Sequence, residues 1–188
     1  MMGARLAVML SGSGRTLENL VAAIGAGALN ASIELVICSR ETIGTAKSRA
    51  ARLTTVVVKG EIPRDELQKM LDEHQINYVV CAGYLKYVHV PAKYAGRVVN
   101  IHPSLLPAFG GAGMYGEKVH EAAIRAGVQV SGCTVHLVDE VYDHGRVLLQ
   151  RTCPVLPEDD AHTLATRVFA EECRAYPEAL QRLIEGGV

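Results

Sequence analysis

Short apolar runs alternate with amphipathic stretches over the first hundred residues. Apolar runs typical of buried strands occupy residues 5–10, 33–38, 55–58, 78–81 and 97–101. Helical spacing of apolar positions predicts helices between these runs, from about residue 16 and over residues 45–52 and 64–74. Continuous apolar strands separated by helices favour a parallel sheet covered on both faces. We therefore expect a Rossmann-like α/β first half with right-handed crossovers.

The pattern changes in the second half of the chain. A helix is predicted over residues 116–126, and two long strands over 132–138 and 147–155 are joined by a polar turn at 139–145. Another helix should run from residues 157–160 to about residue 175, and Pro177 should begin a second short helix that ends at residue 185. The hairpin predicts an antiparallel C-terminal edge on a mostly parallel twisted sheet with helices on both faces. We expect one domain over residues 1–188 with halves at about 1–100 and 101–188.

Composition and charge exclude several classes of protein. The 188 residues carry a net charge of −1, without the basic excess of a nucleic-acid binder. Runs of 18 apolar residues are absent, and residues 1–10 lack the pattern of a signal peptide, so we expect a cytoplasmic protein with no membrane partner. The five cysteines show no C-x-x-C spacing, which predicts neither a disulfide framework nor a zinc site. Four lie in strand-like runs and should be buried apolar residues: Cys38, Cys81, Cys133 and Cys153.

A glycine-containing loop follows the first predicted strand. Gly12, Ser13, Gly14, Arg15 and Thr16 lead directly into the first predicted helix. Glycines allow close approach of an anion, and the free N–H groups at a helix N-terminus favour phosphate. The loop matches neither G-x-x-x-x-G-K-[ST] nor G-x-G-x-x-G. Phosphate binding and a purely structural turn with a capping hydroxyl both remain open.

Asn100 and His102 lie just after the fifth predicted strand, where ligands bind in open α/β sheets. Two residues apart in extended backbone, they should point the same way. A carboxamide beside an imidazole suits acyl transfer, because one can hold an oxyanion while the other moves protons. The alternative is a capped loop with a hydrogen-bonded histidine. Asp143 belongs to an acidic turn that could simply be solvated; beside an imidazole it would raise the histidine pKa.

Several segments together resemble a known family. They are Ala82-Gly83-Tyr84-Leu85-Lys86, Asn100-Ile101-His102-Pro103-Ser104-Leu105-Leu106-Pro107, Thr134-Val135-His136 with Asp143 seven residues on, and Glu172 with Tyr176-Pro177. In this order they resemble the phosphoribosylglycinamide formyltransferases, a branch of the folate-dependent formyltransferases. The resemblance implies transfer of the formyl group of 10-formyltetrahydrofolate to the amine of N1-(5-phospho-D-ribosyl)glycinamide (glycinamide ribonucleotide), in purine biosynthesis. It implies no metal, no nucleic acid and a monomer or homodimer.

The resemblance also implies roles for residues that match the family's motifs. The catalytic residues would be Asn100, His102 and Asp143. Glycinamide ribonucleotide would be bound by Gly14, Arg15, Thr16, Phe169, Ala170, Glu171 and Glu172. The folate would be bound by Leu85, Lys86, Tyr87, Val88, Asn100, Asp139, Glu140, Val141, Tyr142 and Asp143. The first half would then bind phosphate, and the second would bind folate and carry the chemistry.

This chain departs from the family pattern in several places. Leu85-Lys86 replaces a frequent Met-Arg, and Arg15-Thr16 replaces a frequent Ser-Asn. Either Lys59 or Arg64 could supply the basic residue that usually meets the folate, and residues 108–116 are rich in glycine. A formyltetrahydrofolate hydrolase or another folate-dependent formyltransferase remains an alternative. Those enzymes would normally carry a regulatory or tRNA-binding domain that 188 residues do not accommodate. A non-catalytic nucleotide-binding module would explain the glycine loop alone.

Overall fold

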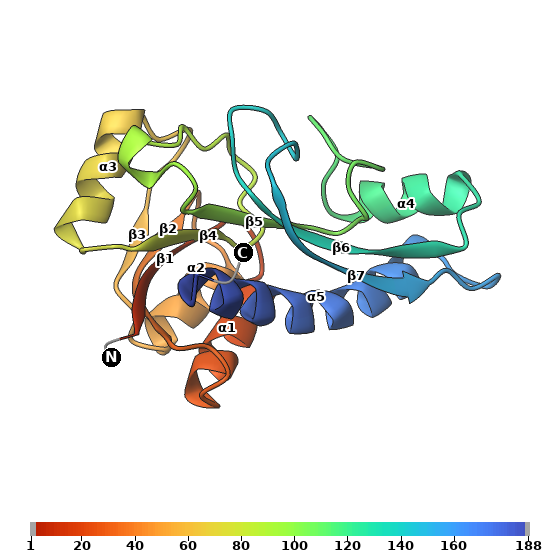
Figure 1. Cartoon of the computed structure of the whole chain (residues 1–188), viewed down its shortest axis with the longest axis horizontal. Helices are drawn as coiled ribbons and strands as arrows, with labels where there is room; N and C mark the ends of the chain where they lie inside the picture. Colours follow the sequence, from red (N-terminus) through yellow and green to blue (C-terminus); the bar gives the residue numbers. More distant parts are fainter. Residues whose placement is uncertain (1–2, 187–188) are drawn as a thin grey trace. The chain divides into compact units, whose positions relative to one another are not determined.

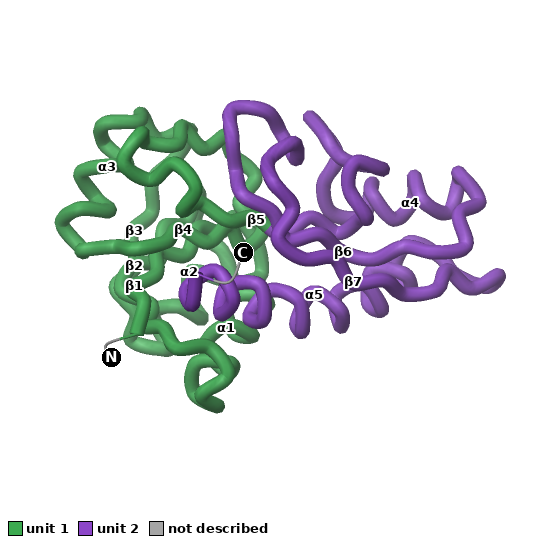
Figure 2. Tube along the Cα trace, viewed as in Figure 1, with its two compact units in different colours: residues 1–100 green, residues 101–188 purple. Residues whose placement is uncertain are grey.

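The computed structural model describes residues 3–186 of the chain. These residues divide after residue 100 into two compact units, which Figure 2 shows in separate colours. The division falls inside strand β5 (Val98–His102), whose first three residues belong to the first unit.

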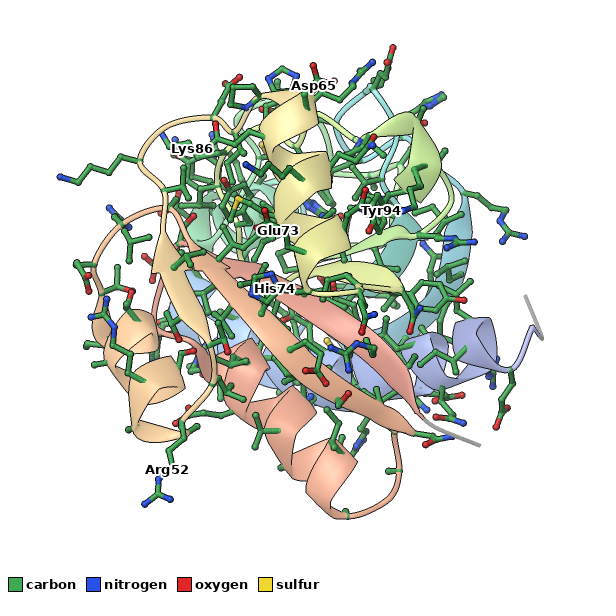
Figure 3. The ribbon with its side chains drawn as sticks, turned by 90° about the vertical axis from the view of Figure 1, so that its left-hand side faces the viewer. Arg52, Asp65, Glu73, His74, Lys86 and Tyr94 are labelled. Carbon is green, nitrogen blue, oxygen red and sulfur yellow. The ribbon has the colours of Figure 1, made fainter. Side chains whose placement is uncertain are left out.

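The first unit contains a five-stranded parallel sheet. The strands are β1 (Ala4–Leu10), β2 (Ala31–Cys38), β3 (Thr55–Val57), β4 (Tyr78–Cys81) and β5, in the order β3-β2-β1-β4-β5. The helices are α1 (Arg15–Gly25), α2 (Ile43–Ala50) and α3 (Arg64–Glu73), followed by a short 3₁₀ turn, Ala92–Tyr94. In Figures 1 and 3, α1 and α2 lie on one side of the strands and α3 on the other. The predicted parallel sheet with helices on both faces is thus confirmed, with strand ends within two residues of expectation.

Local chemistry explains where these helices begin and end. Thr42 caps α2, because its hydroxyl accepts a hydrogen bond from the Thr45 amide. In turn, the Thr45 hydroxyl accepts a hydrogen bond from the Thr42 amide. The carboxylate of Asp72 on α3 accepts hydrogen bonds from Tyr94 Oη at 2.9 Å and Lys93 Nζ at 2.8 Å. Figure 3 labels Asp65 near the start of α3, and Glu73 and His74 at its end. α3 is therefore held in place by its apolar face and by this pair of contacts.

The second unit contains an antiparallel strand pair and two helices. Its elements after β5 are α4 (Glu117–Arg125), β6 (Val130–Leu137), β7 (Val147–Pro154) and α5 (Ala161–Ile184). β6 pairs with β7 in antiparallel register, and α5 packs against both strands and against α4 (Figure 1). The predicted antiparallel C-terminal edge is confirmed. None of the described helices is long and apolar enough to cross a membrane.

The prediction that Pro177 begins a separate helix is wrong. α5 continues through Pro177 to Ile184 as one helix of 24 residues. Proline within a helix forfeits one backbone hydrogen bond, which disfavours but does not forbid continuation. Here Tyr176, Pro177 and Leu180 are all buried, so apolar packing of this turn offsets the lost hydrogen bond. Asp160 and Thr163 start the helix with reciprocal capping hydrogen bonds.

The four cysteines expected in strands are buried, as predicted: Cys38, Cys81, Cys133 and Cys153. No disulfide joins any of the five cysteines, all of which lie within residues 3–186. Burial raises the pKa of Cys81 to about 12, and burial together with nearby carboxylates raises that of Cys133 to about 12. Thiols with such pKa values stay protonated at neutral pH and behave as small apolar side chains.

Candidate active site

The His102 imidazole lies at the end of β5 and is almost fully buried, with 3% of the residue exposed. Asn100 precedes it by two residues on the same strand, so both side chains point to one face of β5. The Nε2 atom of His102 lies 2.9 Å from the carbonyl oxygen of Phe109. Because a carbonyl can only accept, Nε2 carries a hydrogen. The other ring nitrogen, Nδ1, lies on the opposite edge of the ring from the Phe109 carbonyl.

Asp143 faces that other side of the His102 ring. Its Oδ2 atom lies 3.4 Å from His102 Nδ1, and the Gly111 amide donates a hydrogen bond to the same oxygen at 2.9 Å. Asp143 sits in the turn between β6 and β7 with a φ of 56°, a left-handed conformation that aspartate tolerates. A Cβ on Gly110 would approach Leu106 Cδ2 to 2.4 Å and Asp143 Cβ to 3.3 Å. Glycine at position 110 therefore permits this close packing.

A second histidine, His136 on β6, contacts the other oxygen of Asp143. Its Nε2 atom lies 3.5 Å from Asp143 Oδ1, and its Nδ1 atom lies 2.8 Å from the carbonyl oxygen of Leu137. Like His102, His136 is buried. In the sequence, His136 stands out only as part of the Thr134-Val135-His136 motif, which predicts no role for its ring. Its alternation with Thr134 on β6 was the one available signal, because alternate residues of a strand share a face.

Thr134 fixes the backbone that follows His102. Its hydroxyl donates to the carbonyl oxygen of Ser104 at 2.7 Å and accepts from the amide of Leu106 at 3.0 Å. Gln150 on β7 also donates to this hydroxyl, at 2.9 Å. Both lone pairs and the proton of one buried hydroxyl are thus used, which holds residues 104–106 rigidly against β6 and β7.

Burial dominates the titration of His102. It lowers the pKa of the imidazole below its ordinary value, although the Asp143 carboxylate and the Phe109 carbonyl act in the opposite direction. The expectation of a raised His102 pKa is therefore wrong in the net direction and right only for the contribution of Asp143. Burial acts to raise the pKa of Asp143, but the hydrogen bond from His136 and the charge of His102 outweigh it and hold that pKa below its usual value.

His120 on α4 adds a third buried imidazole in this unit. Its Nδ1 atom is buried and has no hydrogen-bond partner among residues 3–186. Burial, and then the charge of His102, lowers the pKa of His120. A neutral ring is the consequence, because protonation would leave a buried charge near His102. Across residues 3–186, His, Cys, Asp and Glu form no group of three that could hold a metal ion.

The glycine loop of the first unit is built from backbone and hydroxyl groups. Gly14 adopts a left-handed conformation with a φ of 75° immediately before α1, and a Cβ added to it would lie 2.9 Å from Gly44 Cα. Ser11 Oγ accepts hydrogen bonds from Ser39 Oγ at 2.7 Å and from the Leu85 amide at 2.9 Å. The loop is therefore rigid, with Arg15 and Thr16 as the first two residues of α1.

The other segments assigned by resemblance are partly exposed. In the first unit Leu85 is 49% exposed, whereas Val88 is buried and bridges to Ile62. In the second unit Val141 is 58% and Tyr142 49% exposed. Such apolar side chains could be covered by a planar ligand.

The segment Phe169, Ala170, Glu171 and Glu172 lies on α5, where four consecutive residues cannot all face one ligand. Glu171 Oε1 accepts a hydrogen bond from Arg174 at 2.8 Å, and its Oε2 lies 4.0 Å from Arg151. Both carboxylate oxygens of Glu171 therefore lie close to arginine side chains. The structure brings Asp143 and His102 together; the roles of all these residues in binding and catalysis stay predictions.

Comparison with known proteins agrees with this arrangement. Residues 4–180 match the formyl transferase family. A phosphoribosylglycinamide formyltransferase of Vigna unguiculata, named as chloroplastic, is 39% identical over 96% of this chain and 61% of its own length. The chain thus spans about three fifths of that curated relative.

Solved structures extend the match. A glycinamide ribonucleotide transformylase 1 from Symbiobacterium toebii is 34% identical with a TM-score of 0.89, covering 98% of this chain and 89% of its own. A phosphoribosylglycinamide formyltransferase from Brucella melitensis is 38% identical with a TM-score of 0.87, covering 99% and 98%. On the family match and these likenesses, the chain belongs to the formyl transferase family.

Proposed function

We propose that this chain transfers the formyl group of 10-formyltetrahydrofolate to the amine of N1-(5-phospho-D-ribosyl)glycinamide, in purine biosynthesis. The products are the N-formyl ribonucleotide and tetrahydrofolate. The observation that carries the proposal is the buried pair of His102 and Asp143, 3.4 Å apart, with Asn100 on the same face of β5 as His102. This combination supplies an uncharged donor, a proton-carrying ring and a carboxylate, which formyl transfer requires.

The reaction needs stabilisation of an oxyanion and movement of one proton. The neutral amine attacks the formyl carbon, the bond from that carbon to N10 of the folate breaks, and one proton passes from the amine to N10. Asn100 and His102 would donate hydrogen bonds to the formyl oxygen as it gains charge. His102 Nε2 would exchange the Phe109 carbonyl for that oxygen. Asp143 would hold the ring orientation and favour its protonated form.

An enzymic base of unusual strength is not required in this scheme. Model α-amines have a pKa of about 7.7–8.0, so a useful fraction of the amine is neutral near pH 7. The residues that matter are therefore those that bind the developing negative charge. A lowered His102 pKa makes the contribution of Asp143 more important, because burial alone disfavours the protonated ring.

Binding of the ribonucleotide phosphate is assigned to the loop before α1. Gly14, Arg15 and Thr16 open a helix of 11 residues, where free amides and the helix dipole favour an anion. Glu172 would contact the ribose, with Phe169, Ala170 and Glu171 supplying the surrounding helix surface. The exposed Leu85, next to Lys86 and Tyr87, would cover the pterin in the first unit.

In the second unit, the exposed side chains of Val141 and Tyr142 would do the same from the turn that also holds Asp139 and Glu140. Burying apolar surface against the ring system would favour binding by about 25 cal/mol per Å². Residues 1–100 would thus bind the phosphate and part of the pterin and supply Asn100, whereas residues 101–188 would bind the rest of the folate and supply His102 and Asp143.

A single assay tests the proposal against its alternatives. Purified protein is mixed with 10-formyltetrahydrofolate, with and without glycinamide ribonucleotide, and formation of tetrahydrofolate and of the formylated ribonucleotide is followed. Turnover that needs the ribonucleotide and yields its N-formyl derivative supports the proposal. Release of formate without any acceptor would instead identify a hydrolase. If neither 10-formyltetrahydrofolate nor the ribonucleotide is consumed, the chain is a binding module without this activity.

We also propose a cytoplasmic protein that acts as a monomer or homodimer. The five cysteines form no disulfide with one another, and four of them are buried, which is consistent with a reducing compartment. Sedimentation of the purified chain at several concentrations measures its oligomeric state, and fractionation of the source cells measures its location.

A further inference from the structure

The Asp143 carboxylate lies between two buried imidazoles. Its Oδ2 atom faces His102 Nδ1 at 3.4 Å, and its Oδ1 atom faces His136 Nε2 at 3.5 Å. The Gly111 amide adds one hydrogen bond to Oδ2. All three side chains are at least nine-tenths buried. One carboxylate therefore serves two titratable rings in a region that water reaches poorly.

Backbone carbonyls determine which ring nitrogens carry hydrogen. His102 Nε2 contacts the Phe109 carbonyl and His136 Nδ1 contacts the Leu137 carbonyl, at 2.9 and 2.8 Å. Both nitrogens must donate, because a carbonyl oxygen has no proton to give. If both rings were neutral, each would turn a lone pair toward the ionised Asp143. Two such contacts between acceptors would be repulsive, so at least one further proton must reside in the cluster.

We propose that His136 is a positioning residue of the reaction, which holds a proton on Nε2 and pairs with Asp143 as an imidazolium. The inference rests on the proposed function, since it concerns how Asp143 acts on His102. A positive charge on His136 offsets part of the negative charge of Asp143. The pKa of His102 is then raised less by Asp143, so the ring can both accept and release a proton during formyl transfer. His136 itself touches no reacting atom in this scheme.

The neighbouring titratable groups agree with this assignment. Besides Asp143, His102 and Asp139 interact electrostatically with His136. The hydrogen bond from His136 is the strongest influence that lowers the pKa of Asp143, and the charge of His136 lowers the pKa of His102. The charge of His102 also acts on His120 of α4, where it lowers the pKa of that buried ring after burial itself.

Two substitutions separate the charge of His136 from its shape. His136→Gln keeps an N–H group near the position of Nε2 but can never be charged. His136→Asn keeps an N–H near the position of Nδ1, facing the Leu137 carbonyl, and withdraws the donor from Asp143. His162→Gln, at an exposed position in the first turn of α5, is the matched control.

The first measurement is ring ¹⁵N NMR of the full chain without substrates at pH 7. We expect both nitrogens of His136 to carry hydrogen. In His136→Gln the His102 titration midpoint should rise by about one pH unit, because a nearby positive charge has been removed. The falling limb of the kcat–pH profile should move upward with it. His162→Gln should change neither quantity.

Two results would overturn the inference: an unprotonated Nε2 on wild-type His136 at pH 7, or an unchanged His102 midpoint in folded His136→Gln. A merely structural His136 would lower thermal stability and leave the pH profile in place. If His136→Gln does not fold, the wild-type spectrum alone decides. Both NMR readings are made without substrates, so they are distinguishable from a failure of the proposed function, which only the transfer assay detects.

Discussion

The two candidate sites of the chain differ in the groups they present. The loop before α1 offers backbone amides, a left-handed glycine and two hydroxyl-bearing side chains, Ser13 and Thr16. The cluster of the second unit offers two imidazoles on one carboxylate, all buried. Backbone amides bind an anion at any pH, whereas imidazoles and carboxylates gain and lose protons.

This difference separates binding from chemistry in a testable way. A substitution that distorts the backbone site should weaken the binding of one substrate and raise the KM for that substrate. Damage to the titratable cluster removes stabilisation that develops in the transition state and should lower kcat. Substitutions in the two regions should therefore give opposite kinetic signatures if the proposed function is correct.

The largest effect is expected from Asp143→Asn. The substitution keeps the shape but removes the charge that favours protonated His102. The His102 pKa, already lowered by burial, should fall further, so the ring would lose its proton at a lower pH. Loss of one oxyanion-stabilising partner costs on the order of 10²–10³ in kcat, and we expect at least that loss with smaller changes in KM. Steady-state kinetics and NMR titration of His102 measure both.

Glu158→Gln is the control for that substitution. Glu158 is an exposed acid of the second unit, outside the 139–145 turn. The Glu158→Gln substitution removes one negative charge from the unit, as Asp143→Asn does, and should leave kcat unchanged. An Asp143→Asn protein with normal kcat and an unmoved His102 titration would reduce Asp143 to a structural turn residue.

The next effect concerns Gly14. Replacement by valine imposes a side chain at a φ of 75° and 2.9 Å from Gly44 Cα, which displaces the loop. Loss of one charge-assisted hydrogen bond to phosphate costs about 1.5–3 kcal/mol. That corresponds to about a ten- to hundredfold rise in KM for glycinamide ribonucleotide. The KM for the folate should change far less.

Gly27 supplies a matched control for backbone strain. Its φ of 72° is close to that of Gly14, but a Cβ there would meet nothing within 4 Å. Gly27→Val should lower stability without changing either KM. Equal rises in both KM values for Gly14→Val would contradict the phosphate assignment.

The fold was predictable from the sequence because its signals are local. Apolar runs of four to eight residues between amphipathic stretches give the parallel strands almost to the residue. Pro177 is the instructive error. Its effect on α5 depends on burial of Tyr176 and Leu180, which is a tertiary property that no local pattern contains.

The candidate site was predictable only in part. Asn100 and His102 follow from strand periodicity, and Asp143 needed the family resemblance, because 41 residues separate it from His102. The contact of His136 with Asp143 and that of the Phe109 carbonyl with His102 depend on how distant segments pack. The lowered His102 pKa was missed for the same reason: the sequence shows the neighbouring charge but not the burial that outweighs it.

A smaller effect should identify the basic residue that meets the folate. Lys59 and Arg64 are both exposed near the start of α3. An exposed ion pair contributes about 0.2–1 kcal/mol, so the relevant alanine substitution should raise the folate KM about 1.4- to fivefold. Higher ionic strength should weaken folate binding by the wild-type protein, so that its folate KM approaches that of the variant. If neither Lys59→Ala nor Arg64→Ala changes the folate KM, the contact comes from another residue.

Removal of metal should have the smallest effect, which sharpens the contrast between a titratable cluster and a metal centre. The cluster positions its own proton donors, and across residues 3–186 no group of three potential ligands could hold a metal ion. In the proposed reaction, Asn100 and His102 stabilise the oxyanion that a Lewis acid would otherwise stabilise. Exhaustive chelation followed by gel filtration should therefore leave kcat within error of the untreated protein. Loss of turnover that zinc or magnesium restores would show that the imidazoles serve as ligands instead, and the proton-based mechanism would be wrong.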